Sequence, residues 1–142
     1  MMFKDHIGIL IKKTSQAFDK TASQVLAPKG LTPSQFKILK YVTLRPEASV
    51  RQIDIENYFC MSNPTVTGIL QNLEKNQWIY RQSHSEDKRS KVIMLTDKAK
   101  NASLFILETS DQIEESFTAV LTDSEKETLR HLLNKLQENH QE

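Results

Sequence analysis

Apolar residues recur every three or four positions in three long stretches of the chain, which is the spacing of helices that bury one face. The first stretch covers residues 3–26 and ends before the helix breaker Pro28-Lys29-Gly30. The second is predicted to run as one helix from Thr96-Asp97 to about Val120. The third opens with Thr122 and Glu125, a capping-box spacing in which each side chain satisfies the other's backbone N–H. These stretches predict a mainly helical protein.

Two shorter helices are predicted between the first and second of these long helices. The segment Thr32–Gln35 is a capping box with proline at the first helical position, and it opens a helix that ends near Arg45-Pro46. The same reasoning makes Ser49 the expected cap of a further helix from Ile53 to about Phe59.

The next segment, residues 62–75, is predicted to be a helix with two unlike faces. Ser62 is a good N-cap, and Pro64 suits the first turn. One face is apolar, with the spacing of a single buried stripe. The other carries small or amide-bearing groups that can come close to a second surface: Asn63, Thr65, Thr67, Gly68, Gln71 and Lys75. Two short helices joined by a turn at Cys60-Met61 are typical of a helix-turn-helix.

A two-stranded ribbon is predicted after this helix. Residues 79–83 and 91–95 are short runs compatible with strands, and residues 84–90 between them are polar and include Lys88 and Arg89. A polar helix face or a polar hairpin tip alone is common on protein surfaces. A polar helix face followed by a basic hairpin tip is what a protein needs in order to read the major groove of DNA with the helix and contact a neighbouring groove with the hairpin. The combination favours a winged helix.

The predicted fold is therefore a winged helix-turn-helix of about six helices and a β ribbon of two or three strands. Residues 1–142 would form a single domain, with residues 31–96 as its DNA-binding lobe. The apolar stripes of residues 3–26 and 99–138 exceed what that lobe could cover. Either they form a separate bundle or they pack against a second copy of the chain. Because the winged unit separates them in sequence, a two-fold dimer built from both termini is the economical arrangement.

The net charge of +1 conceals an uneven distribution of charge along the chain. Residues 1–107 hold 16 Lys and Arg against 9 Asp and Glu, a balance of +7, whereas residues 108–142 hold 3 against 9, a balance of −6. A basic body can approach a polyanion, and an acidic tail would be repelled by it. An ordinary uneven surface is the alternative explanation.

Candidate chemistry of other kinds is sparse. No cleavable leader and no apolar run of roughly 18 residues is found, and the single cysteine excludes an intrachain disulfide, so a cytoplasmic protein is expected. Cys60 is expected to be a small buried residue in a turn rather than a redox sensor. The four histidines lack metal-ligand spacing, and no phosphate loop or catalytic set is present. We therefore expect no cofactor, no metal and no enzymatic activity.

Three segments resemble the MarR (multiple antibiotic resistance regulator) family. The wing sequence from Asp87 to Thr96 matches that family's D-x-R…L-T signature. Residues 62–75 resemble its recognition helix, and Leu31–Phe36 is similar to its usual entry into the second helix. The resemblance extends in order over essentially the whole chain.

The resemblance implies a bacterial homodimeric transcriptional regulator, expected to be a repressor, that binds a pseudo-palindromic operator in double-stranded DNA. Release by a small-molecule effector bound between the winged lobes and the dimer bundle is also implied. The recognition helix would present these residues to the major groove: Ser62, Asn63, Pro64, Thr65, Thr67 and Gln71.

The same resemblance implies DNA contacts for the residues of the wing. Arg89 would reach into the minor groove, and Asp87 would orient the basic groups of the wing by an ion pair. Lys88, Ser90 and Lys91 would contact phosphates. The sequence departs from many relatives at Gly68, where arginine or another polar residue often stands. Close approach of the helix backbone to DNA is one reason for a glycine there.

A second reading remains open, in which the winged helix is a protein-interaction module without sequence-specific DNA binding, with the acidic tail as its contact. The salt dependence of binding to duplex DNA separates the two, because counterion release makes phosphate contacts steeply salt-sensitive.

Overall fold

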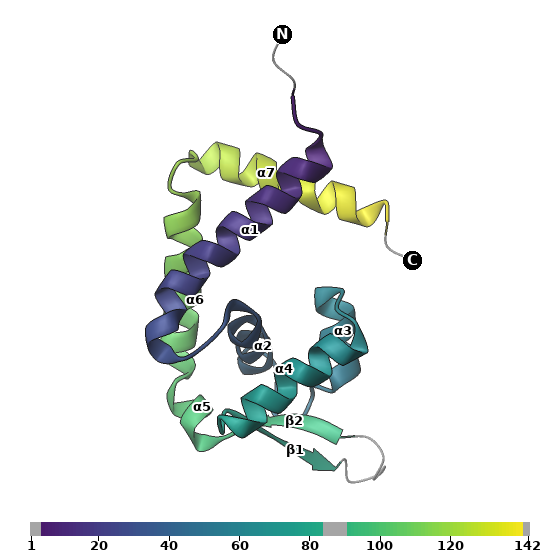
Figure 1. Ribbon diagram of the computed structural model, residues 1–142, viewed down its shortest axis with the longest axis vertical. Helices are drawn as coiled ribbons and strands as arrows, with labels where there is room; N and C mark the ends of the chain where they lie inside the picture. The colour runs from purple at the N-terminus through teal and green to yellow at the C-terminus, as the bar shows by residue number, and fades with distance from the viewer. Residues whose placement is uncertain (1–3, 84–90, 141–142) are drawn as a thin grey trace.

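The computed structural model of the chain describes residues 4–83 and 91–140 (Figure 1). Within them the chain forms seven α-helices, one short 3₁₀ helix and a two-stranded antiparallel sheet, which confirms the predicted mainly helical winged-helix class with one helix more than expected. In chain order the elements are α1 (Ile7–Leu26), η1 (Ala27–Lys29), α2 (Pro33–Thr43), α3 (Gln52–Phe59), α4 (Asn63–Lys75), β1 (Ile79–Ser83), β2 (Lys91–Leu95), α5 (Asp97–Asn101), α6 (Ser103–Thr118) and α7 (Asp123–Glu138).

The elements divide between two ends of an elongated molecule. Helices α1 and α7 lie at one end, α2, α3, α4 and the β ribbon lie at the other, and α6 runs along one side between them (Figure 1). Helix α6 packs against both α1 and α2 and so joins the two ends. The ribbon has the predicted strands, paired from Ile79 opposite Leu95 to Ser83 opposite Lys91.

The core lies mainly between α2, α3, α4 and the ribbon, with α6 closing one side. Fully buried side chains come from each of these helices, and burying one such side chain stabilises the fold by about 1.5–3 kcal/mol. The largest are Leu26, Ile38, Leu39, Ile55, Leu70, Leu73 and Ile106. The apolar stripe predicted for residues 62–75 is therefore the face by which α4 is held on the core.

Most helix starts agree with the predicted caps. In α2 the Gln35 N–H donates to Thr32 Oγ1 and the Thr32 N–H donates to Gln35 Oε1, each at 3.1 Å. Thr122 and Glu125 form the same reciprocal pair at the start of α7, and Ser62 Oγ accepts from the Thr65 N–H at 3.3 Å. These caps satisfy N–H groups that a helix leaves without partners.

The predicted cap of α3 is wrong. The Ser49 hydroxyl donates to the Pro46 carbonyl at 2.6 Å, and the helix starts two residues later, where Asp54 Oδ2 accepts from the Arg51 N–H at 2.9 Å. The later start of α3 is caused by contacts with a distant part of the chain. Val50 is extended and its carbonyl accepts from the Ile93 N–H of β2 at 2.8 Å, and Arg51 forms an isolated bridge with Val92.

Two other boundaries differ from the predictions. Helix α1 begins at Ile7 rather than at residue 3, and His6 before it is in an extended conformation. The single helix expected from residue 97 to 120 is broken at Ala102, where φ is −93° and ψ is 2°. The break lets α5 pack on β2 while α6 packs on α1 and α2, surfaces that one straight helix could not follow.

Cys60 is exposed, which corrects the expectation of a buried thiol. It ends α3 in the left-handed conformation with φ 54°, and the following Met61 N–H donates to the Glu56 carbonyl at 3.0 Å. This is the helix-ending turn normally occupied by glycine. A thiol at such a position faces solvent because the chain reverses there.

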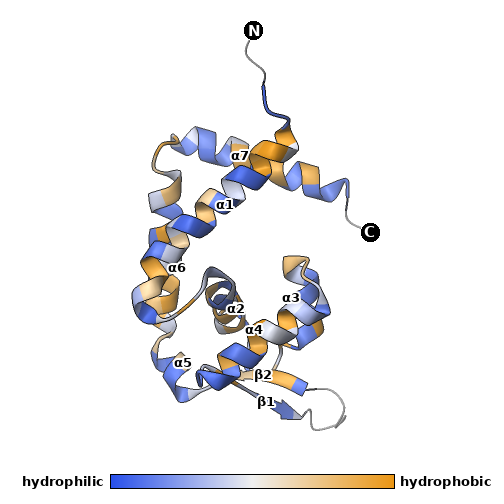
Figure 2. Cartoon of the chain, viewed as in Figure 1, coloured by the Kyte–Doolittle hydropathy of each residue, from blue (hydrophilic) through white to orange (hydrophobic). Residues whose placement is uncertain are grey.

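Apolar side chains remain exposed at the α1–α7 end. Figure 2 shows hydrophobic residues at the start of α1 and along α7. None of the described residues of α7 is buried, although four leucines recur on it with helical spacing. The exposed residues are Ile7, Ile9, Leu10, Ile11, Leu129, Leu132, Leu133 and Leu136. Among the described helices, none is both long and apolar enough to cross a membrane.

Candidate nucleic-acid interface

The outer face of α4 presents most of the side chains predicted to enter a groove. Five of the six residues named for this helix are exposed: Ser62, Asn63, Pro64, Thr65 and Gln71. The sixth, Thr67, is half-buried. They lie on the side of the helix opposite Val66, Leu70 and Leu73, which are buried. The packing of the apolar stripe therefore determines which side chains α4 offers to a ligand.

Hydrogen bonds orient the first turn of α4. The Asn63 amide donates from Nδ2 to Glu56 Oε2 of α3 at 3.0 Å. The Ser62 hydroxyl donates to Thr65 Oγ1 at 2.9 Å while accepting from the Thr65 N–H. Helix α3 thus holds the N-terminus of α4, where free N–H groups can meet a phosphate.

Gly68 leaves part of the α4 backbone uncovered. A Cβ at this position would have no neighbour within 4 Å among the described residues, so packing within the chain does not require glycine. A glycine in the middle of a helix lowers its stability by about 0.8–1 kcal/mol relative to alanine. The surface above Gly68 is consequently open to close approach by another molecule.

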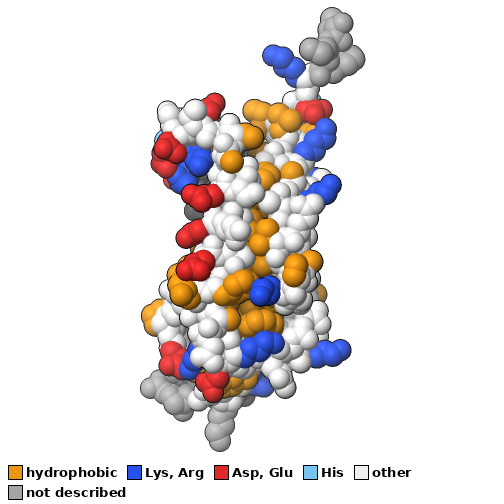
Figure 3. Space-filling view, turned by 90° about the vertical axis from the view of Figure 1, so that its left-hand side faces the viewer, with side chains coloured by type: hydrophobic (Ala, Val, Ile, Leu, Met, Phe, Trp, Pro, Cys, Tyr) orange, Lys and Arg blue, Asp and Glu red, His pale blue; other side chains and the backbone are white. Residues whose placement is uncertain are grey.

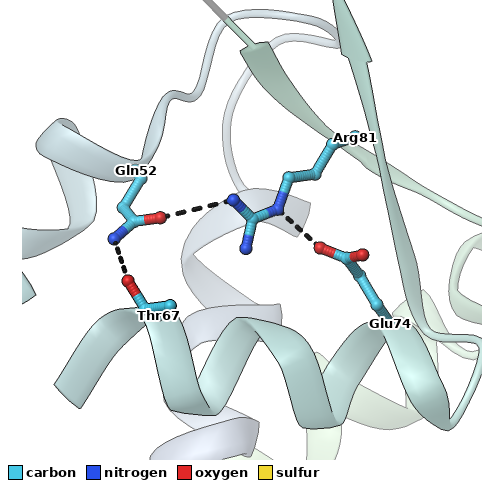
Figure 4. A network of polar contacts seen from close by, with 4 residues as sticks. All are labelled: Gln52, Thr67, Glu74 and Arg81. Atoms are coloured by element: carbon cyan, nitrogen blue, oxygen red, sulfur yellow. Dashed lines mark hydrogen bonds and ion pairs between the residues drawn. The ribbon is translucent and has the colours of Figure 1, made fainter. Parts of the chain in front are cut away.

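A polar network missed by the sequence analysis connects α4 to α3 and β1 (Figure 4). It contains Gln52, Thr67, Glu74 and Arg81. A signal for it was present in β1, where the alternation that buries Ile79 and exposes Tyr80 turns the half-buried Arg81 back toward the helices. An arginine at an inward position needs polar partners.

The wing is only partly described. Lys91, a predicted phosphate contact, is exposed at the start of β2. Asp87, Lys88, Arg89 and Ser90 lie outside the described residues.

One lysine in the described part of the chain has a shifted pKa. A hydrogen bond from Lys100 Nζ to Glu47 Oε1 at 3.2 Å, together with the charge of that carboxylate, raises the pKa of Lys100. The pair joins the α2–α3 loop to α5.

A cavity of about 390 Å³ lies between α1, α2 and α6. Its walls combine apolar side chains such as Phe18 and Phe36 with basic and acidic groups, namely Lys37, Lys40, Asp19, Asp111 and Glu114. Figure 3 views the side of the molecule on which α1 and α6 lie, and shows hydrophobic side chains along that face with acidic groups on one flank and basic groups toward the other. No group of three or more His, Cys, Asp or Glu placed to hold a metal occurs among the described residues.

Comparisons with known proteins agree with this architecture. The MarR family model matches residues 31–91. The chain is 33% identical over 127 residues to the HTH-type transcriptional regulator YwoH of Bacillus subtilis (strain 168), covering 89% of this chain and 90% of that protein. It is 27% identical over 135 residues to the multiple antibiotic resistance protein MarR of Escherichia coli (strain K12), covering 92% and 90%.

Two solved structures are similar over nearly the whole chain. The S. aureus MepR–DNA complex superposes with a TM-score of 0.86 at 26% identity, covering 96% of this chain and 99% of that one. The reduced form of E. coli MarR superposes with a TM-score of 0.78 at 26% identity, covering 95% and 98%. YwoH is a transcriptional regulator by name, the MepR structure contains DNA, and none of these proteins is named as an enzyme. The resemblance seen in the wing and recognition-helix motifs is confirmed, and the chain belongs to the MarR family.

Proposed function

We propose that the chain is a sequence-specific DNA-binding transcriptional regulator, acting as a repressor, that binds a pseudo-palindromic operator as a homodimer. Helix α4 enters the major groove and the wing, residues 84–90, enters the minor groove. The observation that carries the proposal is the exposed polar face of α4 beside the ribbon, with bare backbone at Gly68. The similarity to MepR, solved with DNA, supports it.

The proposed division of labour follows the two ends of the molecule. Residues 31–96 read DNA, and residues 3–26 and 99–138 form the dimer, all within one MarR-type domain. The exposed apolar residues of α1 and α7 support this assignment, because a contiguous apolar surface is the usual mark of an interface. The protein is assigned to the cytoplasm, where its DNA ligand lies.

The proposal is tested by selecting genomic fragments that the protein binds and measuring their affinity as a function of salt. Preferred fragments should share a pseudo-palindrome, and log K should fall linearly with log salt concentration. A scrambled duplex of the same length is the control. Binding that ignores both sequence and salt would support the alternative of a protein-interaction module and would contradict the proposal.

We also propose that a small-molecule effector occupies the cavity between α1, α2 and α6. Helix α6 contributes to its wall and connects through α5 to the ribbon, so a ligand there can alter the placement of the DNA-reading elements. Anilinonaphthalene sulfonate, an apolar anion, serves as a probe. It should weaken operator binding by the wild type but not by Ser110→Phe, which fills the cavity.

The control for that experiment is Ser116→Phe, the same change at an exposed position of α6. It should respond to the probe as the wild type does. Equal weakening of operator binding in wild type and Ser110→Phe would place the probe elsewhere.

A further inference from the structure

Arg81 of β1 connects the ribbon to α4 through one contact and to α3 through a second (Figure 4). Its Nε donates to Glu74 Oε1 at 2.5 Å, in the last turn of α4. Its Nη1 lies 3.5 Å from Gln52 Oε1, at the first position of α3. The guanidinium is a rigid planar fork, so one arginine can hold two partners at fixed relative positions.

Gln52 extends the connection to the other half of α4. Its Nε2 donates to Thr67 Oγ1 at 2.9 Å and lies 3.4 Å from the Asn63 carbonyl oxygen. The chain of contacts therefore leaves α4 at Glu74, passes through the ribbon and α3, and returns to α4 at Thr67. Three elements that are separate in sequence are held in one arrangement.

The network contributes little to the stability of the fold. The side chains of Arg81 and Glu74 are 26% and 39% exposed, and ion pairs with such exposure contribute weakly. Arg81 already forms an ion pair with Glu74, so its charge is not available as an unpaired cation for a phosphate. Its geometry instead fixes the angle between the strand that leads to the wing and the helix that reads bases.

We propose that Arg81 is a positioning residue for DNA reading. Through Glu74 and Gln52 it sets the distance between the major-groove contacts of α4 and the minor-groove contact of the wing before DNA is bound. The inference rests on the proposed function and assigns it a residue that touches no base. The ion pair with Glu74 is the main contact between β1 and α4, and Gln52 connects Arg81 to Thr67.

Two single variants distinguish positioning from electrostatics, because they remove charges of opposite sign. Arg81→Met removes a positive charge, which by electrostatics alone would weaken all DNA binding. Glu74→Met removes the oxygen that accepts from Arg81 together with a negative charge beside the DNA-reading face, and by electrostatics alone the loss of that charge would strengthen DNA binding. If positioning is what matters, both variants lose operator affinity and neither loses affinity for scrambled DNA.

The experiment titrates full-length wild type, Arg81→Met, Glu74→Met and the double variant against operator and scrambled duplexes at several salt concentrations. Each single variant should bind the operator about five- to tenfold more weakly, with scrambled binding within about twofold and the salt slope unchanged. The double variant should be no weaker than Arg81→Met, because both changes break one connection. Arg81→Lys, which can keep the pair with Glu74 but lacks the fork that also reaches Gln52, should recover part of the operator affinity.

Lys91→Met is the contrasting control, since Lys91 is exposed on the neighbouring strand and is a proposed phosphate contact. It should weaken operator and scrambled DNA alike and make the salt slope shallower by about one. Thermal unfolding of every variant checks that the fold persists.

Several outcomes would overturn the inference. Wild-type operator affinity in Arg81→Met would show that the network does not position anything. Equal loss on both duplexes with a shallower slope would make Arg81 a direct phosphate contact. If Arg81→Met fails to fold, Glu74→Met decides, and tighter or unchanged operator binding by it refutes positioning. A wild type that cannot distinguish operator from scrambled DNA refutes the proposed function itself, whereas the other outcomes leave that function intact.

Discussion

Single residues in left-handed backbone end two of the helices without the glycine that such positions favour. Cys60 has φ 54° and Gln77 has φ 64°, and in each case the next N–H donates back to the helix, from Met61 to Glu56 and from Trp78 to Leu73. Gly30, with φ 72°, performs the same role before α2. Non-glycine residues pay a steric cost in this conformation because Cβ approaches the following carbonyl oxygen.

This geometry predicts that Gln77→Gly and Cys60→Gly each raise the free energy of unfolding, by about 0.5–1 kcal/mol after the greater chain entropy of glycine is subtracted. Urea unfolding measures the change. Gly30→Ala is the opposite case and should lower the stability. Equal stability of all three variants and the wild type would show that the left-handed turns relax without cost.

Gly68 allows the contact with DNA to be separated from folding. Gly68→Ala should raise the free energy of unfolding by about 0.5–1 kcal/mol, because alanine is the better helix former and its Cβ meets open space. It should also lower operator affinity if DNA lies against this backbone. Urea unfolding and operator titration measure the two effects.

The control is Ser116→Ala, which raises the helix propensity at an exposed position of α6. It should raise the free energy of unfolding without changing operator affinity. A Gly68→Ala variant that binds the operator as the wild type does would remove the close-approach explanation.

At the scale of elements, α4 and the wing are proposed to read DNA by different means. Gln71→Ala removes an exposed amide that can pair with adenine, so it should cost about 1–3 kcal/mol on the operator, with little loss on random DNA and no change in salt slope. Arg89→Ala removes a charge proposed to read the width of the minor groove. It should weaken operator and random DNA alike and make the salt slope shallower by about one.

Titration of both variants against operator and scrambled duplexes at several salt concentrations distinguishes these effects. Because a dimer presents each residue twice, both should appear in two half-sites about 10–10.5 base pairs apart. If Arg89→Ala binds both duplexes as the wild type does, the wing is not at the DNA.

For the whole molecule, the exposed apolar stripes of α1 and α7 are proposed to form the dimer interface. Deleting residues 123–142, or introducing Leu132→Lys, should weaken the dimer and operator binding together. Leu132 is 49% exposed in the single chain, and a leucine buried in an interface contributes about 1.5–3 kcal/mol in each protomer. Sedimentation and gel shift measure the two quantities.

Asn134→Lys, which adds the same charge to the polar side of α7, should leave the dimer intact. A truncated chain that remained dimeric and bound its operator normally would refute the assignment of the dimer to these helices.

The sequence by itself determined the features that depend on local chemistry. A hydroxyl and an amide or carboxylate three residues apart satisfy the same N–H groups in any fold, so the capping boxes at Thr32 and Thr122 were predictable, as was the single hydroxyl cap at Ser62. The strand limits at 79–83 and 91–95 followed from the change of period, and the family followed from the wing and recognition-helix motifs. The polar face of α4 followed from the same periodicity.

Only the tertiary structure decided the features that depend on distant partners. Pairing of Val50 with β2 moved the start of α3 from Ser49 to Arg51, and the different surfaces under α5 and α6 broke the predicted long helix at Ala102. Arg81 and Gln52 are 29 residues apart, so no local pattern could bring them together. Hydrogen bonds between neighbours in sequence can be inferred from residue types, whereas contacts across the fold exist only once the core has placed the elements that carry them.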